Sequence, residues 1–195
     1  MTLTKNGDFM IKIYGKNCTY EAIFAGHRLE CVYTTVETTQ KDPNFTKLLD
    51  DKKIKYNIID KKKMDSMFPQ SQGYGAYASD YQYVTLEESL SKKSQGREIY
   101  LILDGLEDPH NFGAILRSAD AFGVKGVIIP KNRSVSVTEV VAHVSTGAIE
   151  YVDIIMVNNL NQALIKLKDN GYWIVGTDIS LTTKPLRIKS AICLC

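Results

Sequence analysis

The stretch from Ile99 to Val124, IYLILDGLEDPHNFGAILRSADAFGV, constrains the fold most strongly. It begins with the apolar run Ile99–Leu103, which has the length of a buried parallel strand. It ends with a helix pattern, because apolar side chains recur at helical spacing and Gly123 stands at the position of a C-cap. Between them lies the polar loop GLEDPHN. Loops that follow strands in open α/β sheets commonly bind ligands, so the sequence predicts an α/β fold with a functional site here.

Strand and helix patterns alternate along the rest of the chain, which predicts a layered α/β architecture. We expect a first domain at residues 9–90 and a second at residues 98–195, joined by a polar linker at residues 91–97. The first domain is predicted to hold strands at 11–14, 31–34 and 55–59, a further strand ending near residue 83, and helices at 17–25, 43–51 and 61–68. The second is predicted to add strands at 126–129, 153–157, 172–176 and 191–195, and helices at 136–144 and 160–167.

The charge distribution gives a weak indication of the partner. The net charge of +2 is too small to indicate nucleic-acid binding by itself. A local run of lysines nevertheless occurs in the first half of the chain, at Lys52, Lys53, Lys55, Lys61, Lys62 and Lys63. A solvated surface and a patch that binds the RNA backbone both remain open for this run.

The cysteines, Cys18, Cys31, Cys193 and Cys195, show no C-x-x-C spacing. Reduced thiols in a cytoplasmic protein are the economical interpretation. Cys193 and Cys195 could ligate a metal, but their apolar neighbours indicate a strand, so we expect no metal site. The N-terminal residues lack an apolar targeting core, and no apolar run approaches the length of a membrane span.

Two chemistries fit the polar loop poorly. A dinucleotide-binding turn requires G-x-G-x-x-G and an acidic residue about 20 positions later. Here Gly105 and Gly113 are eight positions apart, and the next strand ends at Pro130 without a carboxylate. A hydrolase could use His110 and Asp108, but the chain has no G-x-S-x-G nucleophile elbow.

The loop and its helix, DGLEDPHNFGAILRSADAFG, closely resemble the first motif of the SpoU family of RNA ribose 2′-O-methyltransferases, in the SPOUT (trefoil-knot) superfamily. Residues 145–150, STGAIE, are similar to the family's S-x-G-A-x-E segment. Residues 159–176 are similar to its N-L…L-K…G-W-V-V-G stretch. The resemblance therefore extends well beyond the loop.

The first half of the chain resembles the small substrate-binding domain of the same family. Residues 14–23 are similar to the start of that domain. Gln72-Gly73 and Ala76 resemble its closing H-Q-G-x-x-A signature, in which Ser71 here replaces the histidine. The resemblance thus covers nearly all of residues 11–195.

The resemblance implies a fold, a cofactor and partners. It implies a small N-terminal α/β domain, similar to kink-turn RNA-binding ribosomal proteins, followed by an α/β-knot (SPOUT) domain with a parallel sheet. The methyl donor would be S-adenosylmethionine, with no metal, and the enzyme would be a homodimer. Among family members the chain looks most like the large-subunit rRNA guanosine 2′-O-methyltransferases. The implied substrate is therefore a 23S rRNA guanosine, with tRNA less favoured.

The same resemblance assigns catalytic roles to Arg117 and to Asn111, which we expect at or before the helix N-cap. A guanidinium is effectively always protonated, so we expect Arg117 to bind phosphate and lower the pKa of the ribose hydroxyl rather than act as a base. Glu107 and Asp108 are expected either to orient Arg117 or to serve the helix N-terminus, and Ser145 to lie near the site. The expected RNA contacts are Lys52, Lys53, Lys61, Lys62, Gln72, His110 and Arg117.

The family carries two further motifs, a G-S-E-G-like loop and an S-L-N-V-S segment, which cradle the cofactor. They would lie beyond Cys195, so the cofactor-binding residues are unknown and the second domain is expected to lack its C-terminal knot segment. We interpret the chain as a fragment, a frameshifted reading frame or a degenerate homologue, and expect it to bind the cofactor poorly and turn over little. The alternative function is a non-catalytic RNA-binding remnant of such an enzyme.

Overall fold

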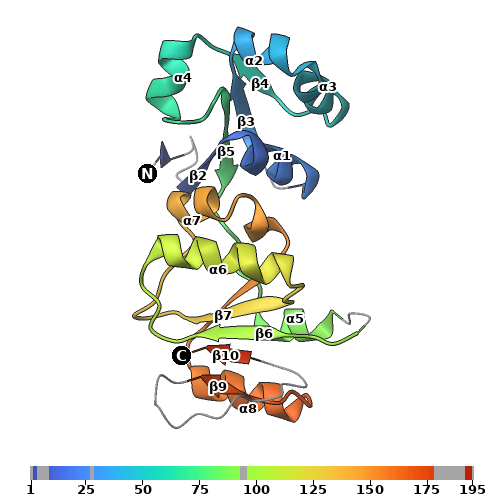
Figure 1. The fold of residues 1–195 in the computed structure, drawn as a ribbon, viewed down its shortest axis with the longest axis vertical. Coiled ribbons are helices and arrows are strands. Elements are labelled where there is room, and N and C mark those ends of the chain that lie inside the picture. The colour runs from blue at the N-terminus through green and yellow to red at the C-terminus, as the bar shows by residue number, and fades with distance from the viewer. Residues whose placement is uncertain (1, 4–8, 27–28, 93–95, 178–191, 195) are drawn as a thin grey trace. The chain divides into compact units, whose positions relative to one another are not determined.

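The computed structural model describes residues 2–3, 9–26, 29–92, 96–177 and 192–194. The chain forms two compact units (Figure 1). Unit 1 consists of Met1–Tyr81 and Val137–Glu150, and unit 2 of Gln82–Ser136 and Tyr151–Cys195. Within the described part of the chain, no helix is both long enough and apolar enough to cross a bilayer.

Unit 1 is built on a mixed sheet. Its strands are β1 (Thr2–Leu3), β2 (Phe9–Tyr14), β3 (Leu29–Thr34), β4 (Tyr56–Ile58) and β5 (Tyr74–Ser79). They lie side by side in the order β1-β2-β5-β3-β4. The pair β3–β4 is parallel, whereas β5 pairs antiparallel with both β2 and β3. Ala76 on the central strand β5 therefore lies opposite Ile13 on one side and Val32 on the other.

The helices of unit 1 are α1 (Lys16–Phe24), α2 (Val36–Lys41), α3 (Pro43–Asp51), α4 (Lys61–Met67) and α7 (Glu139–Val144). Side chains of α1 and α3 pack on the sheet in one core, where Ile23, Phe45 and Leu49 are fully buried. The predicted start of α3 is confirmed, since Asp42 is its N-cap and Pro43 its first residue. The sequence-based prediction missed α2, whose N-cap Thr35 accepts a hydrogen bond from the Thr38 amide.

Asp42 links α1, α3 and the sheet of unit 1. Its Oδ2 atom accepts hydrogen bonds from the hydroxyls of Tyr20, at 3.1 Å, and Tyr74, at 2.8 Å. Lys16 Nζ lies 2.8 Å from the same oxygen. These partners, led by the Lys16 hydrogen bond, lower the pKa of Asp42 although its burial opposes the shift. Burial and the bond to Asp42 raise the pKa of Tyr20 to about 12.

Residues 137–150, distant in sequence, complete unit 1 through α7 and the 3₁₀ turn Ala148–Glu150. The His143 ring stacks on Tyr14 with centroids 4.2 Å apart. Gly147 has φ = 98°, and a Cβ there would lie 2.6 Å from the Glu21 side chain. Only glycine fits this close approach to α1, which gives a packing reason for the glycine of the STGAIE segment.

Unit 2 is built on a parallel sheet. Its strands are β6 (Tyr100–Leu103), β7 (Gly126–Pro130), β8 (Asp153–Val157), β9 (Gly176–Thr177) and β10 (Ile192–Leu194), in the order β8-β7-β6-β10-β9. The paired strands run parallel, as the apolar runs predicted. The prediction of a strand at 172–176 is wrong except at its last residue, Gly176, which belongs to β9. The Tyr172 amide instead donates to the Leu167 carbonyl and closes the turn after the preceding helix.

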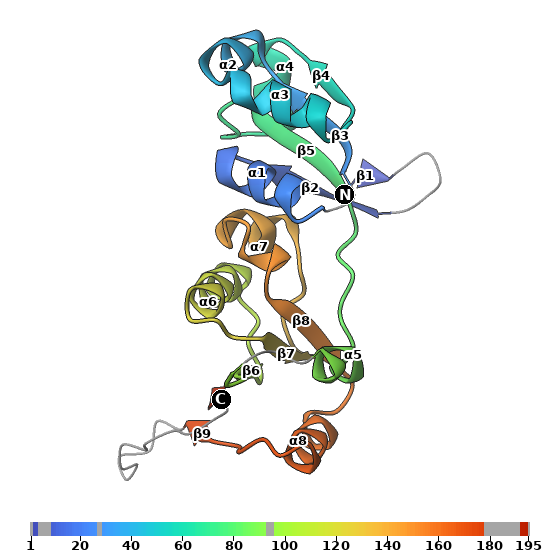
Figure 2. The ribbon, with the colours of Figure 1, turned by 90° about the vertical axis from the view of Figure 1, so that its right-hand side faces the viewer.

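The sheet of unit 2 has helices on both faces (Figure 2). Helix α6 (Pro109–Ala121) covers one face, and α5 (Leu86–Ser91) and α8 (Leu160–Asp169) cover the other. The alternation of strand residues explains this division. Tyr100, Ile102 and Ile128 share a core with side chains of α5 and α8. Their neighbours Leu101 and Val127 therefore point toward α6, where Phe112 and Leu116 are fully buried.

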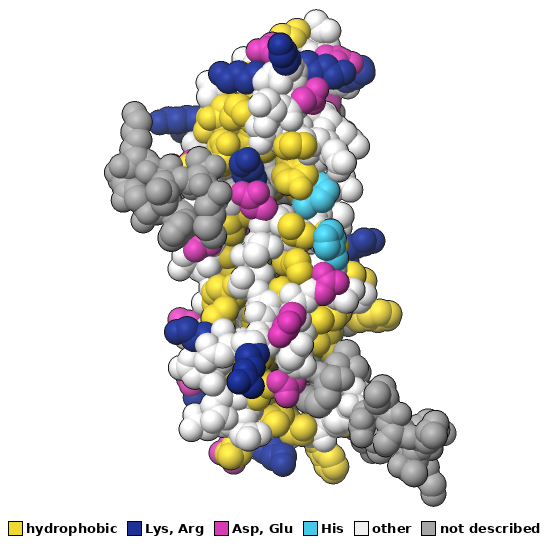
Figure 3. Space-filling model, turned by 90° about the vertical axis from the view of Figure 1, so that its left-hand side faces the viewer, with side chains coloured by type: hydrophobic (Ala, Val, Ile, Leu, Met, Phe, Trp, Pro, Cys, Tyr) yellow, Lys and Arg dark blue, Asp and Glu magenta, His cyan; other side chains and the backbone are white. Residues whose placement is uncertain are grey.

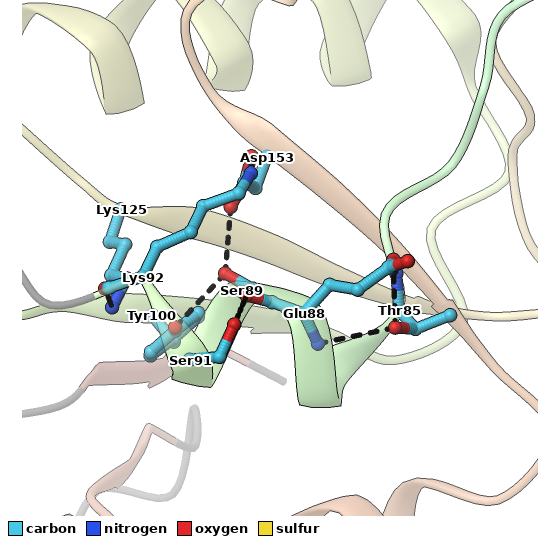
Figure 4. Close-up of polar contacts among 8 residues, drawn as sticks. All are labelled: Thr85, Glu88, Ser89, Ser91, Lys92, Tyr100, Lys125 and Asp153. Carbon is cyan, nitrogen blue, oxygen red and sulfur yellow. Dashed lines mark hydrogen bonds and ion pairs between the residues drawn. The ribbon is translucent and has the colours of Figure 1, made fainter.

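A polar cluster fixes α5 to the amino ends of three strands of unit 2 (Figure 4). The buried hydroxyl of Ser89 lies 3.0 Å from the Tyr100 hydroxyl and donates to Asp153 Oδ2 at 2.8 Å. Lys92 Nζ binds the other oxygen of Asp153 at 2.9 Å. Lys125, which immediately precedes β7, pairs with Glu98 at 2.7 Å.

These contacts explain a difference between the expected and observed organisation. The first domain was expected to extend to residue 90 and the linker to span residues 91–97, but the two units divide between Tyr81 and Gln82. Helix α5 belongs to unit 2 because Ser89 is bonded into its sheet. A capping box between Thr85 and Glu88 starts this helix, and that sequence signal was overlooked. Residues 93–95 of the expected linker lie outside the described residues.

Candidate functional site

The loop after β6, residues 104–108, lies where the strand order of unit 2 reverses. From β6 the chain proceeds to β7 and β8 on one side, whereas β10 and β9 lie on the other side. Ligands of open parallel sheets bind at the carboxyl ends of strands beside such a reversal. The topology therefore supports the loop that the sequence singled out as a candidate site.

Helix α6 begins immediately after this loop. Asp108 is its N-cap and accepts a hydrogen bond of 2.9 Å from the His110 amide, while Pro109 is the first helical residue. The expectation that Asn111 lies at or before the N-cap is wrong, because the Asp108-Pro109 pair starts the helix earlier. Asn111 is instead the third residue of α6.

Within α6, His110, rather than Asn111, lies on the same face as Arg117. His110 and Arg117 are seven residues apart and therefore differ by about 20° around the helix axis. Asn111 lies about 120° around the axis from Arg117. All three side chains are exposed. Among the described residues, none forms an ion pair with Arg117.

Asn111 lines a groove between α6 and the sheet, which we call the α6 groove. Its volume is about 680 Å³, and its lining is mainly apolar. Leu101 comes from β6, Leu106 from the loop, and Ile115 and Phe122 from the helix side. The Phe122 side chain is 82% exposed, which is unusual for a phenylalanine. The groove is therefore an apolar surface that nothing in the described part of unit 2 covers.

The other residues expected near this site have structural roles or stay exposed. Asp108 serves the helix N-terminus, which was one of the two roles considered for it. Glu107 is exposed in the loop. Ser145 is fully buried, and its hydroxyl donates to the Ala142 carbonyl at 3.0 Å at the end of α7. This hydrogen bond gives Ser145 a role in ending α7.

The lysines expected to contact RNA lie on the surface of unit 1, where basic side chains are interspersed with carboxylates (Figure 3, top). Lys52 and Lys53 follow α3, and Lys61 and Lys62 are the first two residues of α4. All four are exposed. Lysines are electrostatically unfavourable at a helix N-terminus, so the position of Lys61 and Lys62 points to a use other than stability.

Lys61 and Gln72 come together at one pocket, although they are separated in sequence. This cavity, the Gln72 pocket, has a volume of about 200 Å³ and is also lined by Glu37, Lys41 and Met64. Sequence reasoning missed Glu37 and Lys41. Their spacing of four residues was an available signal for a helical ion pair, and Lys41 Nζ lies 2.6 Å from Glu37 Oε1.

Comparison with protein families assigns both parts of the chain. Residues 98–193 match the SpoU rRNA Methylase family, and residues 12–84 match the family described as RNA 2′-O ribose methyltransferase substrate binding. A TrmH family tRNA/rRNA methyltransferase of Staphylococcus aureus is 43% identical over 175 residues, covering 88% of this chain and 71% of the relative. Its counterpart in Staphylococcus saprophyticus is 43% identical over 178 residues, covering 89% and 71%.

Solved structures share the fold. An AdoMet-bound rRNA methyltransferase from Sinorhizobium meliloti superposes with a TM-score of 0.71 at 17% identity, covering 95% of this chain and 69% of that one. The SpoU methyltransferase AviRb from Streptomyces viridochromogenes, in complex with AdoMet, gives 0.67 at 18% identity, covering 97% and 73%. An RNA 2′-O ribose methyltransferase gives 0.72 at 23% identity, covering 97% and 72%. The chain therefore belongs to the SpoU (TrmH-like) family of S-adenosylmethionine-dependent RNA methyltransferases.

Proposed function

We propose that this chain transfers a methyl group from S-adenosylmethionine to a ribose 2′-hydroxyl of RNA, with a 23S rRNA guanosine as the target. The observation that carries the proposal is the placement of Arg117. Its exposed guanidinium shares a face of α6 with His110, and α6 starts at the loop beside the reversal of strand order. An RNA strand lying on this face would meet both side chains.

Arg117 is proposed as the catalytic residue on the RNA side. Its planar fork of N–H donors matches the oxygens of the phosphate next to the target ribose. The fixed positive charge also favours the deprotonated form of a nearby 2′-hydroxyl, so it promotes reaction without acting as a base. Holding the phosphate and favouring loss of the hydroxyl proton are the two tasks that this residue can perform.

Asn111 and His110 are proposed to contact the same nucleotide region from different sides. His110 lies near the start of the Arg117 face and can add a hydrogen bond to the RNA backbone. Asn111 lies at the α6 groove, where its amide can both donate to and accept from the nucleotide. Asn111 is proposed as the second catalytic residue. Its task would be to position the ribose, whereas Arg117 would bind the phosphate.

The α6 groove does not form a cradle for S-adenosylmethionine. The cofactor carries a carboxylate, an ammonium and a sulfonium, which require charged and polar partners. Asn111 and Ser118 are the polar side chains lining the described α6 groove, and no charged side chain lines it. When bound, the cofactor supplies an already activated methyl group. The tasks proposed for the described residues are confined to binding and orienting RNA.

Unit 1 is proposed to bind the RNA around the target. Lys52, Lys53, Lys61 and Lys62 would contact phosphates, and Gln72 would contact a base or sugar. Their exposure supports this role, as does the unfavourable position of Lys61 and Lys62 in the first turn of α4.

We further propose that the working form is a homodimer, in which a second copy covers the α6 groove. The apolar lining and the exposure of Phe122 support burial of this surface in an assembly. A symmetric partner would bury the same patch on both copies, as twofold interfaces do.

The function is tested by identifying the methylated product. The purified chain is incubated with a 23S rRNA transcript and S-adenosylmethionine carrying an isotopically labelled methyl group, and the RNA is digested to nucleosides for mass spectrometry. The proposal expects labelled 2′-O-methylguanosine, at the low turnover expected of this chain. A label found only in base-methylated nucleosides would contradict the ribose assignment. RNA binding without any methyl transfer would favour the non-catalytic RNA-binding alternative.

A further inference from the structure

The Gln72 pocket is a concave site, and its lining includes other side chains besides the surface lysines. It is a hollow of about 200 Å³ in unit 1, lined by α2, α4 and the loop before β5. Met64 is 1% exposed and forms an apolar part of its wall. Charged and amide side chains, Glu37, Lys41, Lys61, Asp65 and Gln72, also line it. The hollow is therefore lined mainly by polar and charged side chains around one apolar side chain, which suits a compact ligand group that carries hydrogen-bonding atoms.

The part of the wall that α2 contributes presents no unpaired hydroxyl. Thr35 and Thr38 both line the pocket and are both buried. Their hydroxyl oxygens are 2.9 Å apart, so they hydrogen-bond to each other. The Thr38 amide also donates to the Thr35 hydroxyl at 3.3 Å. Each of the two hydroxyl oxygens therefore has a hydrogen-bond partner within the wall.

The loop that carries Gln72 adopts a costly backbone. Gln70, Gln72 and Gly73 all have left-handed φ values, of 63°, 55° and 87°. A Cβ on Gly73 would lie 2.0 Å from Thr38 Oγ1, so the loop backbone packs directly against α2. Left-handed glutamines are unfavourable and persist where surrounding structure fixes them, often at binding sites. Here the conformation places Gln72 at the pocket.

The polar groups of the pocket complement a nucleotide. Lys41 and Lys61 can bind a phosphate as point charges. Glu37 is paired with Lys41. Lys41 first, and then Lys61, lower the pKa of the Glu37 carboxyl, so this carboxylate stays a hydrogen-bond acceptor near neutral pH. The carboxylate and the Gln72 amide together offer acceptors and donors for the edge of a base.

We propose that the Gln72 pocket binds one unpaired nucleotide of the RNA substrate, with its base in the hollow and its phosphate at Lys41 and Lys61, and that guanine is preferred. Guanine presents two adjacent N–H donors on its Watson–Crick edge, which suit a carboxylate acceptor. Proteins read single-stranded RNA by taking splayed-out bases into such pockets. This proposal rests on the proposed function in one respect, that the ligand of the chain is RNA.

The test compares two fluorescein-labelled heptanucleotides, an all-uridine strand and the same strand with a central guanosine, by fluorescence anisotropy on the full chain. The expected preference for the guanosine strand is about fivefold, the value of one well-placed hydrogen bond. Glu37→Gln is expected to remove the preference, because an amide offers the donors of guanine a single acceptor oxygen in place of two. Equal binding of both strands by the unmodified chain would overturn the proposal.

Two glutamines provide a matched control. Gln72→Ala and Gln70→Ala each place alanine at a left-handed position of one loop, but of these two only Gln72 lines the pocket. Gln72→Ala is expected to lose the guanosine preference and Gln70→Ala to keep it. The same effect in both variants would attribute the loss to the loop fold and overturn the role of Gln72.

A spectroscopic measurement locates the base directly. In a chain with ¹³C-labelled methionine methyl groups, the Met64 signal, assigned by its loss in Met64→Leu, is expected to shift at about fivefold lower concentration of the guanosine strand than of the all-uridine strand. An unmoved Met64 signal at saturating RNA would overturn the pocket assignment. Because this experiment reports binding without methyl transfer, its failure is separable from failure of the proposed enzymatic function.

Discussion

His110 and Arg117 lie seven residues apart on α6 and share one exposed face of that helix, about 10 Å apart along its axis. Asn111, only one residue from His110, lies on a different side and lines the α6 groove. The helix that begins at Pro109 therefore separates two functions proposed for neighbouring residues. One face would hold the RNA backbone, and the adjacent groove would be covered by a second copy, so that Asn111 would lie where the RNA and the partner surface meet.

The lysines at the start of α4 are expected to contribute to RNA affinity through phosphate contacts. Replacing Lys61 and Lys62 together by alanine should weaken binding and reduce the slope of log K against log salt by about 1.4, at roughly 0.7 per phosphate contact of a single strand. Filter binding over a series of salt concentrations measures the slope. Lys47→Ala, which removes an exposed lysine of α3, is the control. An unchanged slope in the double variant would contradict phosphate contact by this pair.

The Ser89 hydroxyl is expected to stabilise unit 2. Ser89→Ala leaves Tyr100 and Asp153 without this buried partner and should lower the free energy of unfolding by about 1–3 kcal/mol. Ser91→Ala is a matched control on the same helix, because its exposed hydroxyl bonds only to the Glu88 carbonyl, and should cost within about 0.5 kcal/mol. Urea unfolding measures both. Equal effects of the two substitutions would argue against the polar cluster as a stabilising feature.

The Asp42 cluster is expected to make unit 1 sensitive to acid. The pKa of Asp42 is lower in the folded chain than in the unfolded chain, and the largest cause is the hydrogen bond from Lys16 to its carboxylate. Its contribution to stability is therefore complete above the unfolded value of about 4, and is lost as pH falls through the lower folded value. Asp42→Asn should be less stable at pH 7 and lose less stability on acidification. Urea unfolding across pH tests this, and parallel pH curves would contradict it.

The α6 groove is expected to be an interface between two copies. Phe122→Glu places a charge on its most exposed aromatic side chain and should convert a dimer into a monomer in sedimentation experiments. Tyr151→Glu, which changes an exposed aromatic residue of unit 2 outside the groove, should leave the assembly unchanged. A monomer before any substitution, or a dimer that survives Phe122→Glu, would contradict the interface.

Much of the fold follows from local sequence patterns. The apolar runs that became β6, β7 and β8 predicted buried parallel strands, and the Asp42-Pro43 and Gly123 signals marked helix ends correctly. The short helices α2 and α5 were missed because each is too short to show a repeated helical pattern of apolar residues. Their stability depends on capping by Thr35 and Thr85 and on tertiary contacts. The strand order, with β10 between β6 and β9, is set by packing that no local pattern encodes.

The candidate site was predictable in part. Arg117 and the loop after β6 were identified from one motif, but whether Asn111 belongs to the helix depends on where α6 begins. Because Asn111 is helical, it lies about 120° around the axis from Arg117 and not on the same face. The Gln72 pocket was less accessible to sequence reasoning, because Glu37, Lys61 and Gln72 meet only in the folded unit 1.

Arg117 is the most direct test of the proposed chemistry. In single-turnover methyl transfer to 23S rRNA, Arg117→Ala should lower the rate about a hundredfold or more, as expected for loss of a group that stabilises developing charge. Arg117→Lys should recover part of the rate, since it keeps the charge but not the planar fork. Arg97→Ala, which removes an exposed arginine near the amino end of β6, should behave like the unmodified chain, and thermal unfolding should show all variants folded. Arg117→Ala transferring methyl groups at the unmodified rate would contradict the central claim.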